Sequence, residues 1–333
     1  MKYLSTLQGN FAKFTFLLLF LLACSPERDN PYDPNSNFYN NKTQISGICK
    51  NRVQVPINNA KINLLPLKSE TPSLQTSTND NGSYELTDCP AESVLVIAEK
   101  DGFVSESAYL SLNVYKSETL NFILEGLPKF ISTQVNSYCI RRYTPQDSTV
   151  LSIKCNISDD EGQSDITSVF ATIESLPDSL PLFFTAGNSY ENSFREESLS
   201  DNLDNIVGRN IYIIACDHTS KAVSSPLQLV RIIRDTLEII SPSWGEIVSS
   251  RPVLEWGAPN FLFSHSFFCE IWYLPHNLQP QLYYRYDNIP ANTTSLTIPD
   301  TNALISGQYY WQIGVKDDYN NWAKSTEAAF EVQ

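Results

Sequence analysis

The sequence predicts an all-β protein in which three β-sandwich domains follow one another behind a signal peptide and a tether without fixed structure. Tyr and Phe are abundant, with 17 of each among 333 residues, and Met occurs only once. Apolar and polar residues alternate in short segments that Gly, Pro, Asn and Asp separate, which is typical of strands and turns. Long stripes with the 3.6-residue period of an amphipathic helix are missing.

Residues 1–23 are predicted to be a signal peptide. The apolar run at 14–24 is shorter than the roughly 20 residues that a membrane-spanning helix needs, and Lys2 and Lys13 precede it. Its end, Leu21-Leu22-Ala23-Cys24, resembles the cleavage box of bacterial lipoproteins. This resemblance implies cleavage behind Ala23 and a new N-terminus at Cys24 that carries palmitate-type acyl chains and holds the protein on a membrane.

The segment 24–43 contains the lipidated Cys24 and is otherwise polar and rich in Pro and Asn, so it cannot bury a core and is predicted to be a disordered tether. Ser25 behind the cysteine favours the outer membrane, by analogy with lipoprotein sorting, and leaves open whether the protein faces the periplasm or the cell surface. The formal net charge of −14 excludes nucleic acid and anionic lipid headgroups as good partners.

The first domain is expected at 44–126. Asp80-Asn81-Gly82 indicates a hairpin between 74–78 and 83–86, and the apolar run 94–98 is typical of a buried strand. The segment resembles a carboxypeptidase regulatory-like (transthyretin-like) β-sandwich, which implies an accessory module without catalytic residues. The resemblance rests on spaced positions, among them Gly47, Pro56-Ile57, Gly82-Ser83-Tyr84, Lys100-Asp101-Gly102-Phe103 and residues 121–124.

The second domain is expected at 127–235. Residues 150–157 alternate and place Ile153, Cys155 and Ile157 on one face of a strand. Further strands are expected at 165–173, 208–215 and 227–233, with one short helix within 197–207. The pattern resembles immunoglobulin-like or cadherin-like domains, although it lacks the Trp that packs on the disulfide of true immunoglobulin domains.

The third domain, 236–333, holds all five tryptophans. Strands are expected at 253–256, 268–273, 282–286 and 328–332. Leu304, Gly307 and Tyr309 precede Trp311, Ile313 and Val315, which recur at every second position. The arrangement resembles the tyrosine corner of fibronectin type III domains, in which a Tyr hydroxyl bonds back to the preceding backbone. The period favours Tyr309 for this role and leaves Tyr310 as the alternative.

Six cysteines remain besides Cys24, and no two have the Cys-x-x-Cys spacing of a zinc or redox site. Cys155 and Cys216 correspond to the bridge between the two sheets of immunoglobulin domains, and Cys49 and Cys89 could close the first domain in the same way. The alternative for all four is a buried free thiol that packs as a small hydrophobic side chain.

Enzyme signatures are absent, and the sequence predicts neither an enzyme nor a cofactor. The three histidines, His218, His265 and His276, form no His-x-x-x-His pair, and no Gly-x-Ser-x-Gly or P-loop motif occurs. A triad built from distant residues stays open, because triads are recognised by geometry.

Two kinds of ligand site are candidates. Acidic turns at Asp159-Asp160 and Asp317-Asp318 could supply oxygen ligands to Ca²⁺, although Asp also occurs in turns for backbone reasons. Adjacent strand residues face opposite sides, so some aromatic side chains of the third domain must point away from its core. These could stack on sugars, or pack ordinarily in the core or against another domain. The candidates are Trp272, Tyr273, Tyr283, Tyr284 and Tyr286.

These observations predict a non-catalytic, membrane-anchored lipoprotein of the cell envelope that acts as a surface or periplasmic binding or scaffold protein. Its expected partners are the membrane, through the lipid anchor, and a protein or glycan. The alternative function is a glycan-binding lipoprotein for polysaccharide capture. An enzyme with an unrecognised site is the weakest of the three hypotheses, because histidines are scarce and the motifs are missing.

Overall fold

The computed structural model describes residues 43–333 except 69–71, 114–115, 143–146, 259 and 277–278. The predicted signal peptide, Cys24 and nearly all of the tether lie outside these residues and stay predictions. The described residues form strands and turns with a single four-residue α-helix, which confirms the all-β class. None of their helices is long and apolar enough to cross a membrane.

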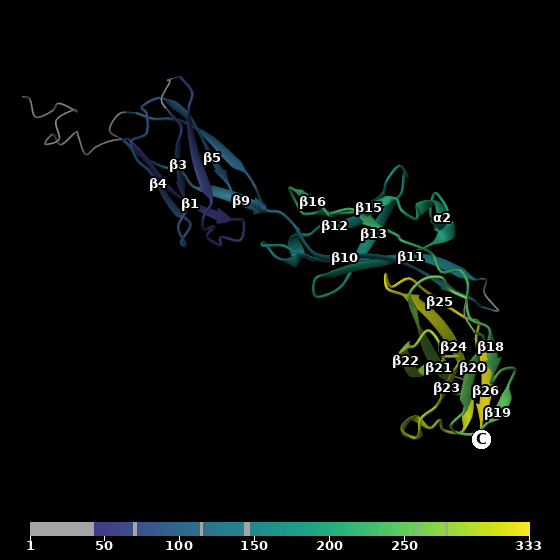
Figure 1. Ribbon diagram of the computed structural model, residues 1–333. Coiled ribbons are helices and arrows are strands. Elements are labelled where there is room, and N and C mark those ends of the chain that lie inside the picture. The colour runs from purple at the N-terminus through teal and green to yellow at the C-terminus, as the bar shows by residue number, and fades with distance from the viewer. Residues whose placement is uncertain (1–42, 69–71, 114–115, 143–146, 259, 277–278) are drawn as a thin grey trace, which may run out of the picture. The chain divides into compact units, whose positions relative to one another are not determined.

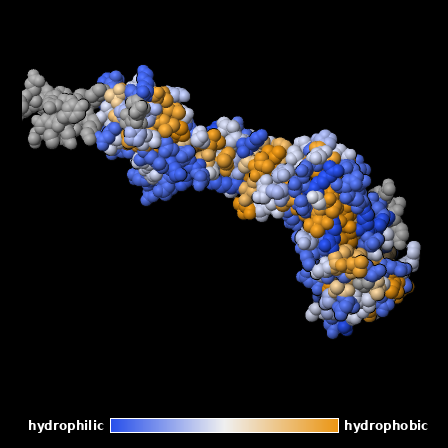
Figure 2. All heavy atoms as spheres, turned by 45° about the horizontal axis from the view of Figure 1, so that its top comes forward, coloured by the Kyte–Doolittle hydropathy of each residue, from blue (hydrophilic) through white to orange (hydrophobic). Residues whose placement is uncertain are grey.

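The chain divides into two compact units, residues 1–126 and 127–333. The second unit contains both segments that the sequence assigns to separate domains (Figure 1). On the face drawn in Figure 2, hydrophobic residues form separate patches within a mostly hydrophilic surface. The first unit is one sandwich, and the second unit consists of two sandwiches joined through β10 and β25.

The first unit packs two sheets over one core. One sheet has the order β4-β1-β9-β6 with β8 beside β1, and the other has the order β3-β2-β5-β7. Alternate residues of each strand enter the core, such as Ile62 and Leu64 from β2 and Val94 and Val96 from β5. The strands are β1 (Gln44–Asn51), β2 (Lys61–Pro66), β3 (Leu74–Ser77), β4 (Ser83–Leu86), β5 (Ser93–Glu99), β6 (Phe103–Val104), β7 (Glu106–Ser111), β8 (Ser117–Thr119) and β9 (Phe122–Gly126).

The hairpin predicted around Asp80-Asn81-Gly82 is wrong. The turn exists, with the Gly82 N–H donating to the Asn79 carbonyl at 2.8 Å and φ of +72° at Gly82. Its flanking strands, however, pair elsewhere: β3 lies against β2, and β4 lies against β1 in the opposite sheet. The turn therefore carries the chain from one layer of the sandwich to the other.

Gly47 in β1 is required by a close approach of the backbone. A Cβ at this position would lie 1.7 Å from the Leu120 carbonyl oxygen. The same carbonyl accepts a hydrogen bond of 2.7 Å from the Tyr84 hydroxyl. The segment before β9 is thus held against β1 by a contact that only glycine permits.

The second unit begins with a sandwich around a core that includes Leu151, Ile153 and Ile157 of β11 and Ile211 and Ile213 of β15. The predicted short helix is present as α2 (Leu203–Ile206), where the Asn202 side chain caps the Asn205 N–H. Of the strand predicted at 227–233, only 227–228 is a strand. The strands are β10 (Lys129–Ile140), β11 (Ser148–Ser158), β12 (Ser168–Ile173), β13 (Ser179–Ala186), β14 (Ser189–Arg195), β15 (Asn210–Cys216), β16 (Lys221–Val223) and β17 (Leu227–Gln228), with 3₁₀ turns η1 (Gln163–Asp165) and η2 (Glu196–Ser198).

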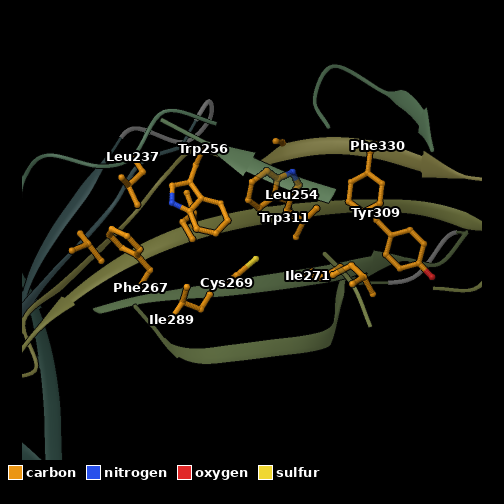
Figure 3. Packing of buried hydrophobic residues seen from close by; sticks show 14 of the residues in the cluster. Leu237, Leu254, Trp256, Phe267, Cys269, Ile271, Ile289, Tyr309, Trp311 and Phe330 are labelled. Atoms are coloured by element: carbon orange, nitrogen blue, oxygen red, sulfur yellow. The ribbon is translucent and has the colours of Figure 1, made fainter. Parts of the chain in front are cut away.

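The C-terminal sandwich places a large sheet, which includes β22, β21, β24 and β25, over the small sheet β18-β20-β23. Its core is the largest of the three and contains Trp256, Phe267, Trp311 and Phe330 (Figure 3). The elements are β18 (Ile239–Ser241), β19 (Glu246–Val248), β20 (Val253–Trp256), β21 (His265–Leu274), β22 (Gln281–Ile289), β23 (Ser295–Thr297), η3 (Asp300–Asn302), β24 (Gly307–Asp317), β25 (Trp322–Lys324) and β26 (Ala328–Val332).

The tyrosine corner is formed by Tyr309, as the period indicates. Its ring is fully buried, and its hydroxyl donates to the Ile305 carbonyl at 3.0 Å. Tyr310 points to the other face of β24. The alternative that the sequence leaves open is thereby excluded.

The two sandwiches of the second unit share one sheet. Tyr138, Cys139 and Ile140 of β10 pair in parallel with Trp322, Ala323 and Lys324 of β25. The rings of Tyr138 and Trp322 stack with centroids 4.6 Å apart and planes 3° apart. The ladder of backbone hydrogen bonds therefore runs without a break from one sandwich into the next.

Asn321 is the central polar group of this junction. It is 1% exposed, and its Oδ1 accepts a 2.8 Å hydrogen bond from the Ser137 N–H. Its own N–H and Nδ2 donate to the two carboxylate oxygens of Asp317 at 2.8 and 3.0 Å. Asp317 also forms an ion pair of 3.2 Å with Arg231, whose carbonyl accepts from the Ser137 hydroxyl.

Neither predicted disulfide is formed, because all six described cysteines are free. In β15 the buried residues are Ile211, Ile213 and Ala215, so Cys216 points away from the core that Cys155 enters. Cys155 is buried as a free thiol, and burial raises its pKa to about 12. Cys49 and Cys89 are likewise buried, and the Cys89 thiol donates to the Leu86 carbonyl at 3.3 Å.

Asn321→Ala is expected to destabilise the second unit by about 1–3 kcal/mol, because it leaves the buried Ser137 N–H without its acceptor and removes a donor to Asp317. Urea denaturation of the chain measures the change. Asp318→Ala is the matched control, since Asp318 lies in the same turn with an exposed side chain. Equal midpoints for both variants would show that the junction contributes nothing to stability.

Candidate functional site

Four of the five aromatic residues proposed as sugar contacts face the core side of the C-terminal sandwich. Tyr273, Tyr283, Tyr284 and Tyr286 pack, partly buried, against its hydrophobic cluster. The Tyr273 and Tyr283 rings lie 5.1 and 5.6 Å from the ring of the corner residue Tyr309. Core packing therefore accounts for these four side chains, as the alternative interpretation of the sequence holds.

Trp272 lies on the opposite, outward face of the sheet. Its ring stacks on the ring of Tyr310, its cross-strand neighbour in β24, with centroids 5.9 Å apart and planes 5° apart. The Trp272 indole N–H also donates to Glu270 at 3.4 Å. Trp272 thus fixes the plane of the Tyr310 ring.

Tyr310 forms part of the wall of a surface hollow of about 690 Å³, which we name the Trp244–Tyr310 hollow. Its walls come from the segment that enters β18, from the turn before β19, and from the chain around the start of β26. The lining residues are Thr236, Leu237, Glu238, Ile239, Ser243, Trp244, Leu274, Tyr310, Thr326, Glu327, Ala328 and Ala329.

Trp244 is held at the edge of this hollow by a tight turn. It has φ of +52° and is followed by Gly245 at +79°, and the Glu246 N–H donates to the Ser243 carbonyl at 3.0 Å. Such a left-handed conformation is unfavourable for a bulky residue. Trp244 is also 86% exposed to solvent. The conformation directs an indole to the surface rather than into the core.

Two hydrogen bonds anchor the turn, and the first of them is buried. The indole N–H of the core residue Trp311 donates to the Pro242 carbonyl at 2.9 Å. The Gly245 N–H donates to the Ala329 carbonyl at 2.8 Å. The position of the exposed Trp244 ring is therefore determined by the sandwich core, and strained backbone of this kind clusters at binding sites.

The hollow has a mixed aromatic and polar lining. Burial raises the pKa of Tyr310, the charges of Glu327 and Glu270 raise it further, and Arg142 acts in the opposite direction. The hydroxyl therefore stays protonated at neutral pH and can both donate and accept. With two aromatic rings, the hydroxyls of Ser243 and Thr326 and two carboxylates, the lining suits a polar ligand with a flat apolar face.

The histidines lie outside this hollow. His218 bonds to Asp165 at 3.0 Å, His265 donates to the Phe263 carbonyl at 2.7 Å within a group of phenylalanines, and His276 is exposed. These contacts are those of surface and packing residues.

A second hollow, of about 750 Å³, lies against β10, β11 and β14. Three of its four arginines, Arg141, Arg195 and Arg234, pair with carboxylates of the same unit. Arg234 bonds to Glu196 and Asp204, both at 2.8 Å, and Arg141 pairs with Asp147. These ion pairs balance most of the positive charge of the lining, so this hollow is a weaker candidate for a charged ligand.

Of the two calcium candidates in the third domain, Asp317 has a structural role and Asp318 has an exposed side chain. Both carboxylate oxygens of Asp317 are engaged by Asn321, Tyr319 and Arg231 at the junction. Asp318 is exposed. Asp317 therefore occupies its turn for backbone reasons.

Asp159 lies in a group of acidic side chains beyond the end of β11. Burial raises the pKa of Asp159, and the negative charges of Asp165 and Asp217 raise it further. Oδ2 of Asp159 and Oδ2 of Asp165 are buried and accept no hydrogen bond from the described residues. Asp160 instead pairs with Lys129 at the surface, at 2.7 Å. Calcium binding at Asp159 and Asp160 stays a prediction.

The sequence did not indicate Trp244, Tyr310, Glu238 and Glu327 as residues of one candidate site. Tyr310 could have been found, because it lies between the core positions Tyr309 and Trp311 and must face outward. The Trp244-Gly245 pair is a turn signal. Nothing in the sequence brings residues 238, 244 and 327 together, since this needs the pairing of β19 with β26.

Comparisons with known proteins give distant likenesses only. No family model matches the chain, and no curated protein matches it. A putative carbohydrate binding protein from Bacteroides uniformis ATCC 8492 is 12% identical, with a TM-score of 0.25 over 56% of this chain and 99% of that one. BcpA, the major pilin subunit of Bacillus cereus, is 7% identical, with a TM-score of 0.32 over 88% and 95%.

The FN1–FN3 domains of chicken CNTN1 are 11% identical, with a TM-score of 0.30 over 82% of this chain and 91% of that one. These scores are too low to carry an argument about ligand or partner. The sandwich architecture rests on the strand pairing described above.

Asp159→Asn is expected to stabilise the protein at about pH 7 in EDTA. The pKa of Asp159 is raised in the fold above its unfolded value, so the ionised carboxylate destabilises the native state above that pKa. As the pH falls through the folded pKa towards the ordinary range near 4, the carboxyl is protonated and the difference from wild type shrinks. Urea denaturation across this pH range measures it.

Asp160→Asn is the control, because its carboxylate forms an exposed ion pair with Lys129 and no gain is expected. An Asp159→Asn variant that is less stable than wild type in EDTA would contradict the repulsion. Asn keeps the oxygen that accepts from the Glu161 N–H, so this contact is not lost.

Proposed function

We propose that this chain is a non-catalytic binding protein of the cell envelope, held to a membrane by acyl chains on Cys24, and that the Trp244–Tyr310 hollow binds a glycan. The anchor is supported by the sequence 14–24 and its resemblance to lipoprotein signals. The binding role is supported by the lining of the hollow. The outer membrane is the proposed location.

The proposal rests mainly on two aromatic residues that line the same hollow. The Trp244 indole is exposed, and the Tyr310 ring is held by stacking on Trp272. One face of a pyranose ring presents polarised C–H groups, which interact favourably with the negative face of an aromatic ring. The hydroxyls at the ring edge can bond to Ser243, Thr326, Glu238 and Glu327 around the hollow. A flat ring with polar edges therefore matches both parts of the site.

A catalytic role has less support. The lining contains no His, Cys or Lys, which are the commonest proton-transfer and nucleophilic groups besides carboxylates. The Ser243 and Thr326 hydroxyls have no histidine beside them in the lining set, so neither has the base that activates a nucleophile.

Trp244→Ala is expected to weaken glycan binding by about fivefold or more, because stacking on an aromatic ring contributes roughly 1–3 kcal/mol for a nucleic-acid base and a sugar stacks in the same way. A glycan array first identifies a bound oligosaccharide, and calorimetry then compares affinities. Trp272→Ala is expected to act in the same direction but less, because it removes the ring that supports Tyr310 rather than a contact.

Tyr284→Ala is the matched control, since it removes a ring of the same sheet that faces the core side. Its affinity should equal that of wild type once folding has been checked by thermal denaturation. A blank array, or an array signal that survives Trp244→Ala, would count against the hollow as a glycan site.

Cys24→Ala is expected to abolish incorporation of labelled palmitate and to move the protein from the membrane to the soluble fraction of the cell. Acyl chains supply the attachment in this proposal, and an acidic chain has no basic patch to replace them. Mass spectrometry of the mature wild-type N-terminus provides the direct measurement. An unmodified and uncleaved N-terminus would refute the anchor.

A further inference from the structure

The Trp244–Tyr310 hollow carries negative charge on two of its sides. Glu238 comes from the segment that enters β18, and Glu327 comes from the segment before β26. No Lys, Arg or His occurs among the lining residues. Arg142 acts on the Tyr310 hydroxyl from outside the lining, and it lies with the arginines of the second hollow.

The carboxylates of Glu238 and Glu327 take no part in the contacts that hold the described residues together. The two buried acidic side chains of the C-terminal sandwich are neutralised: Glu270 pairs with Arg285 and Lys324, and Asp317 pairs with Arg231. By contrast, neither the Glu238 nor the Glu327 side chain makes a hydrogen bond or ion pair with any described residue. Two unused carboxylates at one hollow leave their charge available to a ligand.

The aromatic rings of the hollow also favour a positively charged ligand. The face of Trp, and less strongly that of Tyr, attracts a cation within about 6 Å. A hydrogen bond from an ammonium group to a carboxylate is roughly twice as strong as one between neutral groups. Rings and carboxylates together therefore select a cationic ligand and repel an anionic one.

Building on the proposed glycan function, we propose that the hollow recognises amino sugars with a free ammonium group and discriminates against glycans that carry uronate, sulfate or phosphate. The sugar ring stacks on Trp244, and the ammonium group lies between the carboxylates of Glu238 and Glu327. This inference concerns the charge of the ligand, whereas the proposed function concerns its being a sugar. The two are therefore tested separately.

The test compares a glucosamine oligomer with its fully N-acetylated counterpart of equal length, by calorimetry on the mature chain at low salt and at a pH where the amine is protonated. The free amine is expected to bind about threefold to tenfold more tightly, because exposed charge pairs are individually weak and two carboxylates are available. Raising the salt to about 1 M should remove most of this preference.

The double variant Glu238→Gln/Glu327→Gln is expected to bind the two oligomers equally while keeping the affinity for the acetylated one. Glu246→Gln is the control, because Glu246 is an exposed acid beside the Trp244 turn that does not line the hollow. It should retain the wild-type preference. Trp244→Ala should weaken both oligomers alike.

Equal affinity of the wild type for both oligomers, or equal affinity for an oligogalacturonate, would overturn the charge preference while leaving a glycan site in place. Binding of a lysine oligomer with the same dependence on Trp244, Glu238 and Glu327, in the absence of sugar binding, would overturn the glycan and assign the hollow to cationic peptides. If neither oligomer binds and a wider glycan array is also blank, the proposed function itself fails.

Discussion

The alternation of side chains along β24 is the constraint on which both the core and the site depend. Tyr309, Trp311, Ile313 and Val315 are fully buried on one face. The residues between them lie on the other face of the strand, where Gln312 and Gly314 are covered and Tyr310 reaches the hollow. Because the period of a strand is two, a shift of one residue would exchange the two sets. It would take Tyr309 from its corner and Tyr310 from the hollow at once.

The same strand also determines where Trp244 stands. Trp311 is buried because it occupies an inward position, and its indole N–H then needs an acceptor. It finds the Pro242 carbonyl, 69 residues earlier in the chain. That hydrogen bond fixes the start of the turn that presents Trp244, so a requirement of the core positions a surface ring. The two aromatic rings of the hollow are thus linked through adjacent residues of one strand.

Local patterns predicted what depends on local physics. The strand class and the corner residue Tyr309 both follow from period-two alternation and turn residues. The prediction of a disulfide between Cys155 and Cys216 was wrong because it overlooked this alternation. In β15 the buried position belongs to Ala215 rather than to Cys216. The turn at 80–82 was recognised, but no local signal shows that β3 and β4 belong to different sheets.

Features that need distant pairing were not predictable. β10 has a weaker burial pattern than β11, and its partner β25 lies more than 180 residues further along the chain. The hollow needs the pairing of β19 with β26 to bring its parts together. The sequence therefore pointed to the aromatic residues of β21 and β22 as sugar contacts. Four of these five side chains pack against the core of the C-terminal sandwich.

The junction between the two sandwiches also bears on the hollow through one extended segment. Arg231 is held at the junction by Asp317 and Ser137. Ile233 and Leu237 then pack in the core of the C-terminal sandwich, and Glu238 follows directly in the wall of the hollow. A segment fixed at both ends loses little further entropy when a ligand binds beside it. The shared sheet therefore fixes the backbone at this wall of the hollow, although the wall has no regular secondary structure.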